Sequence, residues 1–203
     1  MNIHSVIAIL DTAPMTARVL DAALAVFTER TYGGTAVPQV AERAGIGVGT
    51  IYRSFEGKEA LANAVYRRAK LALLDHLHAA LGALGADATT FDQVAAAWAG
   101  LAAYAAGDPD GFAFLEHQQH ATYLDDASRA VSDRVDALGA DLIRAGQARG
   151  DLRDGDPDLL VALVFGAFVG LTKAARSRSR PLAPADVSRA GDAVWHLLAR
   201  PAD

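Results

Sequence analysis

Apolar residues recur every three or four positions along most of the chain, which is the spacing of amphipathic α-helices. In the segment TARVLDAALAVFTER, the positions with this spacing are Val19, Ala23, Val26, Phe27 and Arg30. The glycine pair at 33–34 interrupts the pattern. The segment therefore predicts one helix that ends before these glycines.

Two short helices are predicted to follow. Thr35 is expected to be the N-cap of the first, because threonine hydroxyls accept hydrogen bonds from free N–H groups at a helix start. Gly45 is expected to end this helix, and Ile46 to be an apolar plug. The expected buried face of the first helix consists of Val37, Val40, Ala41 and Ala44. The second short helix is predicted from about Gly47 to Phe55, with Ile51 and Phe55 facing the core.

A longer helix is predicted to begin at EGKEAL and to end near residues 82–85. Two short helices joined by a tight turn and braced by longer helices form a helix-turn-helix. The remaining pattern predicts helices at 89–106, 110–120, 124–149, 157–176 and 185–199. The predicted fold is all-α, with an arm at 1–15, a DNA-binding domain at 16–62 and a helical domain at 63–203.

Charge is distributed unevenly over the 203 residues, which carry a net charge of −5. Residues 1–70 hold eight Lys or Arg and six Asp or Glu, so the acidic excess lies in the rest of the chain. A slightly basic first segment is compatible with a small DNA-binding unit. Cysteine is absent, which excludes disulfides and thiolate metal sites. The longest apolar run, 159–171, is shorter than a membrane span and predicts a buried helix, so we expect a cytoplasmic protein without a membrane partner.

The segment AGIGVGTIYRSF concentrates glycine where the flanking pattern predicts helix. Each mid-helix glycine costs about 1 kcal/mol relative to alanine. Glycine on an exposed helix face allows backbone N–H groups to approach phosphate closely. We therefore interpret Gly47 and Gly49 as part of a nucleic-acid-binding surface.

From about residue 16 to residue 62 the sequence resembles the N-terminal DNA-binding domain of TetR-family transcriptional regulators. The resemblance lies in the threonine before the second helix and in the motifs AERAG, GTIY and KEAL, with a Phe three residues after the Tyr. It implies a homodimer that binds a palindromic operator, usually as a repressor, and whose second domain binds a small-molecule effector. We expect no cofactor and no catalytic residues, because the sequence contains no nucleophile–base constellation, phosphate loop or cofactor motif.

Carried over residue by residue, the resemblance implies two sets of DNA contacts. Phosphate contacts are expected from Thr35, Thr50, Tyr52 and Lys58, and Gly47, Val48 and Gly49 are expected to face the groove. Three positions depart from the family pattern. Gly47-Val48 stands where Ser-Lys is frequent, Ser54 replaces the usual His, and Thr31 replaces a frequent glycine.

Helices 157–176 and 185–199 are expected to form the four-helix dimer interface. The first is apolar on nearly every face and must be covered all round. The expected interface residues are Leu163, Gly166, Ala167, Gly170, Val194, Trp195 and Leu198. The alternative is that this helix is buried within one subunit.

An effector pocket between helices is expected to use aromatic and histidine residues. The candidates are Trp98, Tyr104, Phe112, His117, His120, Tyr123, Phe165 and Phe168. Phe114 is a further aromatic, and all of these aromatics are equally compatible with an ordinary core.

Two other functions remain open from the sequence. Glu116, His117 and His120 are spaced so that two of them can meet on one helix face and bind a metal, as in an all-helical metal enzyme. A helical interaction module with a degenerate DNA-binding domain is the other alternative, because the frequent lysine is absent at position 48.

Overall fold

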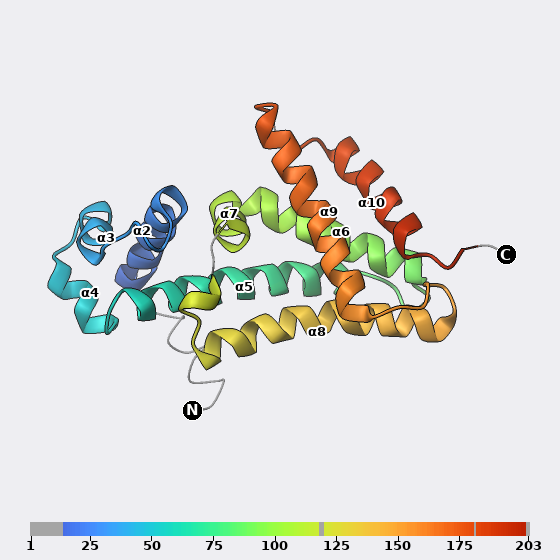
Figure 1. Cartoon of the computed structure of the whole chain (residues 1–203), viewed down its shortest axis with the longest axis horizontal. Helices are drawn as coiled ribbons and strands as arrows, with labels where there is room; N and C mark the ends of the chain where they lie inside the picture. Colours follow the sequence, from blue (N-terminus) through green and yellow to red (C-terminus); the bar gives the residue numbers. More distant parts are fainter. Residues whose placement is uncertain (1–13, 118–119, 181, 202–203) are drawn as a thin grey trace. The chain divides into compact units, whose positions relative to one another are not determined.

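The structure is a computed structural model that describes residues 14–117, 120–180 and 182–201. The regular structure in these residues is helical, and Leu152 pairs with Ala199 in an isolated antiparallel β-bridge. The helices are α2 (Pro14–Arg30), α3 (Val37–Ala44), α4 (Val48–Ser54), α5 (Lys58–Gly82), α6 (Thr90–Gly107), α7 (Pro109–His117), the 3₁₀ helix η1 (His120–Thr122), α8 (Asp126–Arg149), α9 (Pro157–Ser177) and α10 (Pro184–Leu198) (Figure 1). The all-α prediction is confirmed, and α2 already begins at the end of the predicted arm.

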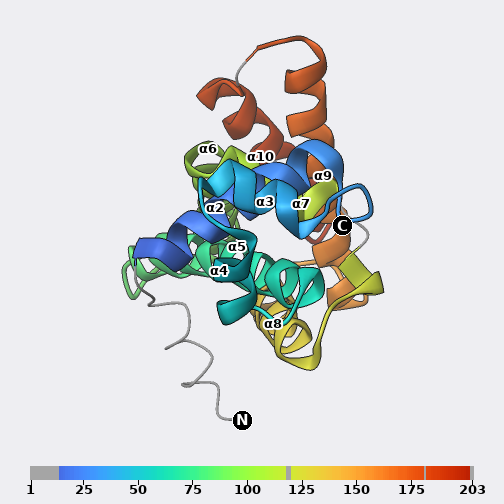
Figure 2. The same ribbon diagram turned by 90° about the vertical axis from the view of Figure 1, so that its left-hand side faces the viewer.

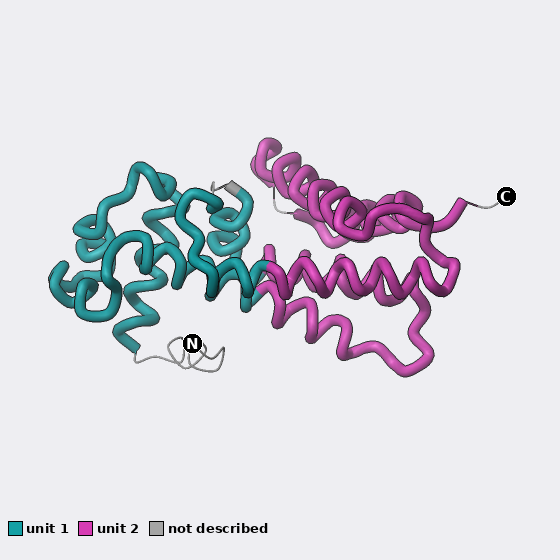
Figure 3. Tube along the Cα trace, turned by 60° about the horizontal axis from the view of Figure 1, so that its bottom comes forward, with its two compact units in different colours: residues 1–72, 107–132 teal, residues 73–106, 133–203 magenta. Residues whose placement is uncertain are grey.

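The chain forms two compact units (Figure 3). Unit 1 contains residues 1–72 and 107–132, and unit 2 contains residues 73–106 and 133–203. The predicted boundary after residue 62 falls inside α5, and the 107–132 segment belongs to the same compact unit as the expected DNA-binding domain. The segment expected to bind DNA is therefore part of a larger compact unit.

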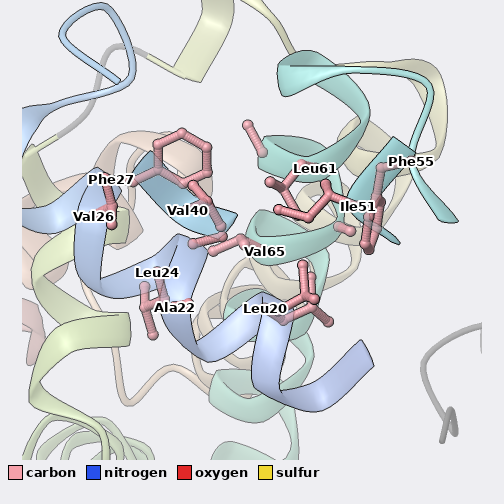
Figure 4. Close-up of a cluster of buried hydrophobic side chains, with 14 of the residues drawn as sticks. Leu20, Ala22, Leu24, Val26, Phe27, Val40, Ile51, Phe55, Leu61 and Val65 are labelled. Carbon is pink, nitrogen blue, oxygen red and sulfur yellow. The ribbon is translucent and has the colours of Figure 1, made fainter. Parts of the chain in front are cut away.

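In unit 1, α3 and α4 are consecutive short helices separated by residues 45–47, with α2 packed on α3 (Figure 2). Figure 4 shows how their apolar side chains converge with those of α5. Phe27 of α2, Val40 of α3 and Ile51 of α4 are fully buried in one cluster with Leu61 and Val65 of α5. The predicted inward positions of Ile51 and Phe55 are confirmed.

The beginning of α3 differs from the prediction by one residue. Ala36 is the N-cap, and its N–H donates to Oε1 of Gln39 at 2.9 Å. The Thr35 hydroxyl instead donates to the Thr31 carbonyl at 2.8 Å. The prediction that Thr35 caps α3 is wrong, because its side chain is used at the end of α2.

The end of α3 follows the prediction. Gly45 has a left-handed conformation with φ 66°, and its N–H donates to the carbonyl of Glu42 at 3.1 Å. The Ile46 N–H donates to the Ala41 carbonyl at 3.0 Å, which is the bond pattern of a glycine-terminated helix. Ile46 packs against the buried cluster as the predicted plug.

Thr31 has φ 63°, a left-handed conformation that is unfavourable for a β-branched residue. This position follows the last residue of α2, where glycine ends many helices. The side chain is exposed, so it contributes little packing in return. The departure of Thr31 from the family pattern therefore carries a conformational cost.

Unit 2 contains most of α6 and α8, the end of α5, and the whole of α9 and α10. Trp98 of α6 lies in its core, edge-to-face with Phe168 of α9 at a centroid distance of 5.1 Å. The Trp98 indole N–H donates to the Val187 carbonyl of α10 at 2.8 Å. Trp98 of α6 thus contacts both α9 and α10 in this unit.

We predict that Thr31→Gly raises the free energy of unfolding by about 1 kcal/mol, because glycine removes the left-handed strain at some cost in unfolded-state entropy. The midpoint in thermal unfolding should rise by about 2–4 °C. Gly45→Ala is the matched control and should shift the midpoint downwards. A lower midpoint for Thr31→Gly would contradict the strained conformation.

Candidate nucleic-acid interface

The first turn of α4 presents backbone with little side chain to the solvent. Gly47 is the N-cap of this helix, and Gly49 lies in its first turn. A Cβ atom added at either glycine would meet no heavy atom within 4 Å, so no internal packing requires glycine there. Val48 between them is half-buried against the core cluster. Gly47 and Gly49 are thus exposed at the end of α4 whose backbone N–H groups lack partners within the helix.

Polar side chains continue this face along α4. The Tyr52 side chain is 52% exposed, the largest exposure of an aromatic residue among those described. The Arg53 guanidinium donates to the Thr50 hydroxyl at 3.1 Å and is exposed. Arg53 was not among the DNA contacts expected from the sequence. It is a cation three residues after Thr50, about one helical turn along the same face.

Two of the predicted phosphate contacts are engaged within the chain. Thr35 is only 4% exposed, so its hydroxyl is withdrawn from solvent. The Lys58 ammonium donates to the Tyr32 carbonyl at 3.0 Å and lies 4.3 Å from the centroid of the Tyr32 ring. We therefore leave Thr35 out of the DNA contacts proposed below. Lys58 binds Tyr32 within unit 1.

His120 is held by two hydrogen bonds in an aromatic environment. Its Nε2 lies 3.0 Å from the Phe114 carbonyl, and its Nδ1 lies 2.5 Å from the Tyr123 hydroxyl. Because a carbonyl only accepts, Nε2 carries the proton, and Nδ1 accepts from the Tyr123 O–H. The rings of Tyr66 and Phe114 lie within 5 Å of the imidazole, centroid to centroid.

Burial lowers the pKa of His120 to about 4, with a smaller contribution from the positive charge of Lys70. The backbone carbonyls of Phe114 and Leu115 oppose this shift. Burial also raises the pKa of the Tyr123 hydroxyl, and the neighbouring Tyr66 and Tyr32 add to that effect. Both groups are therefore neutral at physiological pH.

The structure separates the residues of the alternative metal site. The helix expected at 110–120 ends at His117, and His120 begins the separate η1, so Glu116 and His120 do not share one helix face. Both ring nitrogens of His120 are hydrogen bonded. Within the part of the chain that is described, no group of three His, Asp or Glu side chains could hold a metal ion. The side chain of His117 lies outside the described residues.

The candidate effector residues divide between the two units. Phe112, His120 and Tyr123 belong to unit 1, and the others with described side chains belong to unit 2. In unit 2, Tyr104 and Phe168 are fully buried. Phe165, on α9, is 37% exposed.

The candidate dimer residues also fall into two groups. Leu163 is 46% exposed, and Gly166, Ala167 and Gly170 lie on the exposed part of α9. Val194 and Leu198 of α10 are 3% and 1% exposed within the single chain, so they contribute no surface to a partner. Trp195 is half-buried, edge-to-face with Phe91 at 5.2 Å.

Comparison with family models gives two consecutive matches. Residues 19–65 match the model of bacterial regulatory proteins of the tetR family. Residues 82–198, more than half of the chain, match the tetracyclin repressor-like C-terminal domain. The chain belongs to the TetR family.

Solved structures of other regulators share the fold. A putative regulator from Shewanella sp. PV-4 is 21% identical with a TM-score of 0.80, covering 93% of this chain and 100% of its own. A regulator from Marinobacter aquaeolei VT8 is 19% identical with a TM-score of 0.81, covering 92% and 96%. The fatty acid degradation regulator FadR from Bacillus halodurans is 18% identical with a TM-score of 0.75, covering 91% and 96%. No curated protein matches the chain.

Membership in the TetR family makes this chain a ligand-responsive transcriptional regulator with a helix-turn-helix DNA-binding domain. The family as a whole is regulatory and not enzymatic, and its members bind operator DNA, a second subunit and a small-molecule effector. The metal-enzyme alternative is not favoured.

We predict that His120 makes the protein less stable as the pH falls from about 6.5 to about 4. In this window the unfolded chain binds a proton at His120 that the folded chain does not, so the free energy of unfolding falls by at most about 1.4 kcal/mol per pH unit. His120→Gln keeps one donor and one acceptor but does not titrate. The stability difference between wild type and this variant should therefore shrink with decreasing pH in urea titrations, and a constant difference would contradict the buried neutral imidazole.

Proposed function

We propose that this TetR-family regulator is a cytoplasmic repressor that binds a palindromic operator as a homodimer, with α4 of each subunit in the major groove. The observation that carries this proposal is the exposed glycine face of α4, held on a buried apolar cluster. In a helix-turn-helix, the second helix enters the major groove while flanking groups contact the backbone. Release of the operator by a small-molecule effector completes the proposed cycle.

The proposed recognition surface consists of Gly47, Val48 and Gly49, with Thr50, Tyr52 and Arg53 directed to the phosphates. Exposure supports both glycines, because a Cβ added at either would meet no atom of the described residues within 4 Å. Arg53 supplies a positive charge on α4, where Val48 supplies none. Phosphate contacts set position, and groove contacts set sequence preference.

The proposed dimer surface is the exposed side of α9. Leu159 and Leu163 are 59% and 46% exposed, and Gly166 and Gly170 continue the same side at helical spacing. Small residues at this spacing allow two helix backbones to approach closely. A C2 dimer pairs the same patch of both subunits, which suits a single self-complementary helix face.

Helix α9 is also long and apolar enough to cross a membrane by length and composition alone, with 22% of its span buried. Its other side buries Leu160, Phe168 and Ala175 against the chain itself. A lone membrane helix is instead surrounded by lipid on every side. We therefore propose a second subunit, and not a bilayer, as the partner of the exposed side.

The effector is proposed to bind among aromatic residues of unit 2, with Trp98, Tyr104 and Phe168 as candidate lining residues. These side chains come from α6 and α9, and Trp98 contacts Phe168 directly. An apolar small molecule suits such surroundings. We propose no catalytic role for the chain.

The first experiment is fluorescence anisotropy with a duplex from the chain's own upstream intergenic DNA and a scrambled duplex, at several salt concentrations. We expect preference for the intergenic duplex and a steep salt dependence, because the contacts are largely to phosphates. Equal weak binding to both duplexes would contradict this operator and this DNA-binding function.

The same assay tests the glycine face. Gly49→Ala should weaken operator binding about tenfold, equivalent to about 1.4 kcal/mol, because a methyl group would separate backbone from DNA. Thermal stability should stay equal or rise, since alanine is the better helix former by up to about 1 kcal/mol. Arg53→Gln should make the fall of log affinity with log salt shallower, by about 0.9 in slope for each phosphate that the arginine neutralises. Tight binding by Gly49→Ala would refute close backbone approach.

Sedimentation velocity tests the dimer surface. Gly166→Leu should convert the dimer to monomer at micromolar concentration, because a leucine on a close helix crossing keeps the two backbones apart. Within the single chain, a Cβ at Gly166 would meet no atom of the described residues within 4 Å, so a side chain there starts in open space. Gly82→Leu is the matched control, because this helical glycine is equally open but lies on α5. A dimer that survives Gly166→Leu would exclude this surface.

A further inference from the structure

A continuous series of side-chain contacts in unit 1 connects the beginning of α5 to η1. The Lys58 ammonium lies over the Tyr32 ring and donates to the Tyr32 carbonyl. The same ring stacks on Tyr123, with centroids 4.2 Å apart and an interplanar angle of 30°. The Tyr123 hydroxyl binds Nδ1 of His120, the first residue of η1.

Tyr123 is fixed at its backbone as well as at its hydroxyl. Its carbonyl accepts from the Asn63 amide at 2.8 Å, and the Asn63 side-chain oxygen accepts from the Asp125 N–H at 2.9 Å. Asn63 is 1% exposed and lies on α5 five residues after Lys58. The segment before α8 is therefore attached to α5 by two hydrogen bonds of one buried amide.

We propose that Lys58, Tyr32, Tyr123 and His120 form a clamp through which η1 positions the beginning of α5, and that Lys58 serves DNA binding as a positioning residue and not as a phosphate ligand. This inference rests on the proposed DNA-binding function. It gives the 107–132 segment a defined part in that function: the segment holds Tyr32 and Lys58 next to the turn that leads from α4 to α5.

The contacts favour the clamp over a phosphate role for Lys58. Its ammonium already has an acceptor and an aromatic face within unit 1. A cation over a ring is attracted by the π-electrons, and movement to a phosphate would give up both contacts. Exposed Arg53 on α4 has no such competing aromatic contact among the described interactions and is the better phosphate ligand.

Salt dependence separates the two roles. Operator affinity is measured at several salt concentrations for Lys58→Gln, Tyr123→Leu, the double variant and Arg53→Gln. We expect Lys58→Gln to weaken binding about tenfold with an unchanged salt slope, whereas Arg53→Gln lowers the slope. The double variant should bind no more weakly than the weaker-binding single variant, because both substitutions break one clamp. Two outcomes would overturn the proposal. One is a salt slope whose magnitude is smaller by about 0.9 in Lys58→Gln, as expected when one phosphate is no longer neutralised. The other is a double variant in which the two losses of affinity add.

Hydrogen exchange without DNA tests the clamp independently of the proposed function. Lys58→Gln and the conservative Tyr123→Phe should speed exchange of the Thr35 amide, which donates to the Tyr32 carbonyl, about tenfold. Arg53→Gln is the control and should leave this amide unchanged. If the clamp variants exchange the Thr35 amide faster but the wild-type protein binds no DNA, the clamp is supported and the DNA-binding function is rejected. Unchanged exchange in both clamp variants would reject the clamp.

Discussion

Helix α4 depends on tertiary packing for its existence. It has seven residues, and its first turn contains a glycine. Isolated helices shorter than about 12–15 residues are marginal in water even with favourable residues. Ile51 and Phe55 anchor α4 in a cluster that α2, α3 and α5 supply. This cluster is therefore the constraint on which the exposed face of α4, and every DNA contact proposed from it, depends.

The same dependence explains why unit 1 extends beyond the helix-turn-helix. Phe114 of α7 and Tyr123 belong to the cluster that contains Phe27 of α2. A domain of two short helices and one longer helix buries little surface, and small domains are correspondingly marginal. The recruitment of α7 and η1 enlarges the core and makes the DNA-binding unit sensitive to the segment that follows α6.

Much of the fold could be predicted from the sequence, because helix starts and apolar spacing are local signals. The pattern predicted a helix from residue 157, where α9 begins after the Asp156 N-cap, and Gly45 predicted the end of α3. The end of α7 could not be predicted in this way. The helical pattern continues to His120, but the structure places this residue in the separate η1, where its side chain makes local hydrogen bonds with the Phe114 carbonyl and the Tyr123 hydroxyl.

The candidate sites were predictable only in part, for a related reason. Periodicity shows that a helix has an apolar face but not what covers it, so Val194 and Leu198 were assigned to a dimer interface although their own subunit buries them. Residue type likewise does not reveal competing partners. Thr35 and Lys58 have the chemistry of phosphate ligands, but the end of α2 and Tyr32 engage them. Arg53 lies outside the residues that carry the family motif, so the resemblance implies no contact for it.

The departures from the family pattern have a common physical consequence. Val48 stands where the family frequently has lysine, so α4 lacks one positive charge. Fewer groups are then left to make favourable electrostatic contacts with DNA. Backbone N–H groups and one arginine are short-range contacts that require accurate placement, whereas a flexible lysine tolerates error in position. A surface of this kind places more weight on the packing that orients α4 and α5. The buried cluster and the Lys58–Tyr32–Tyr123–His120 contacts supply that orientation, so the proposed phosphate contacts depend on how accurately α4 and α5 are placed.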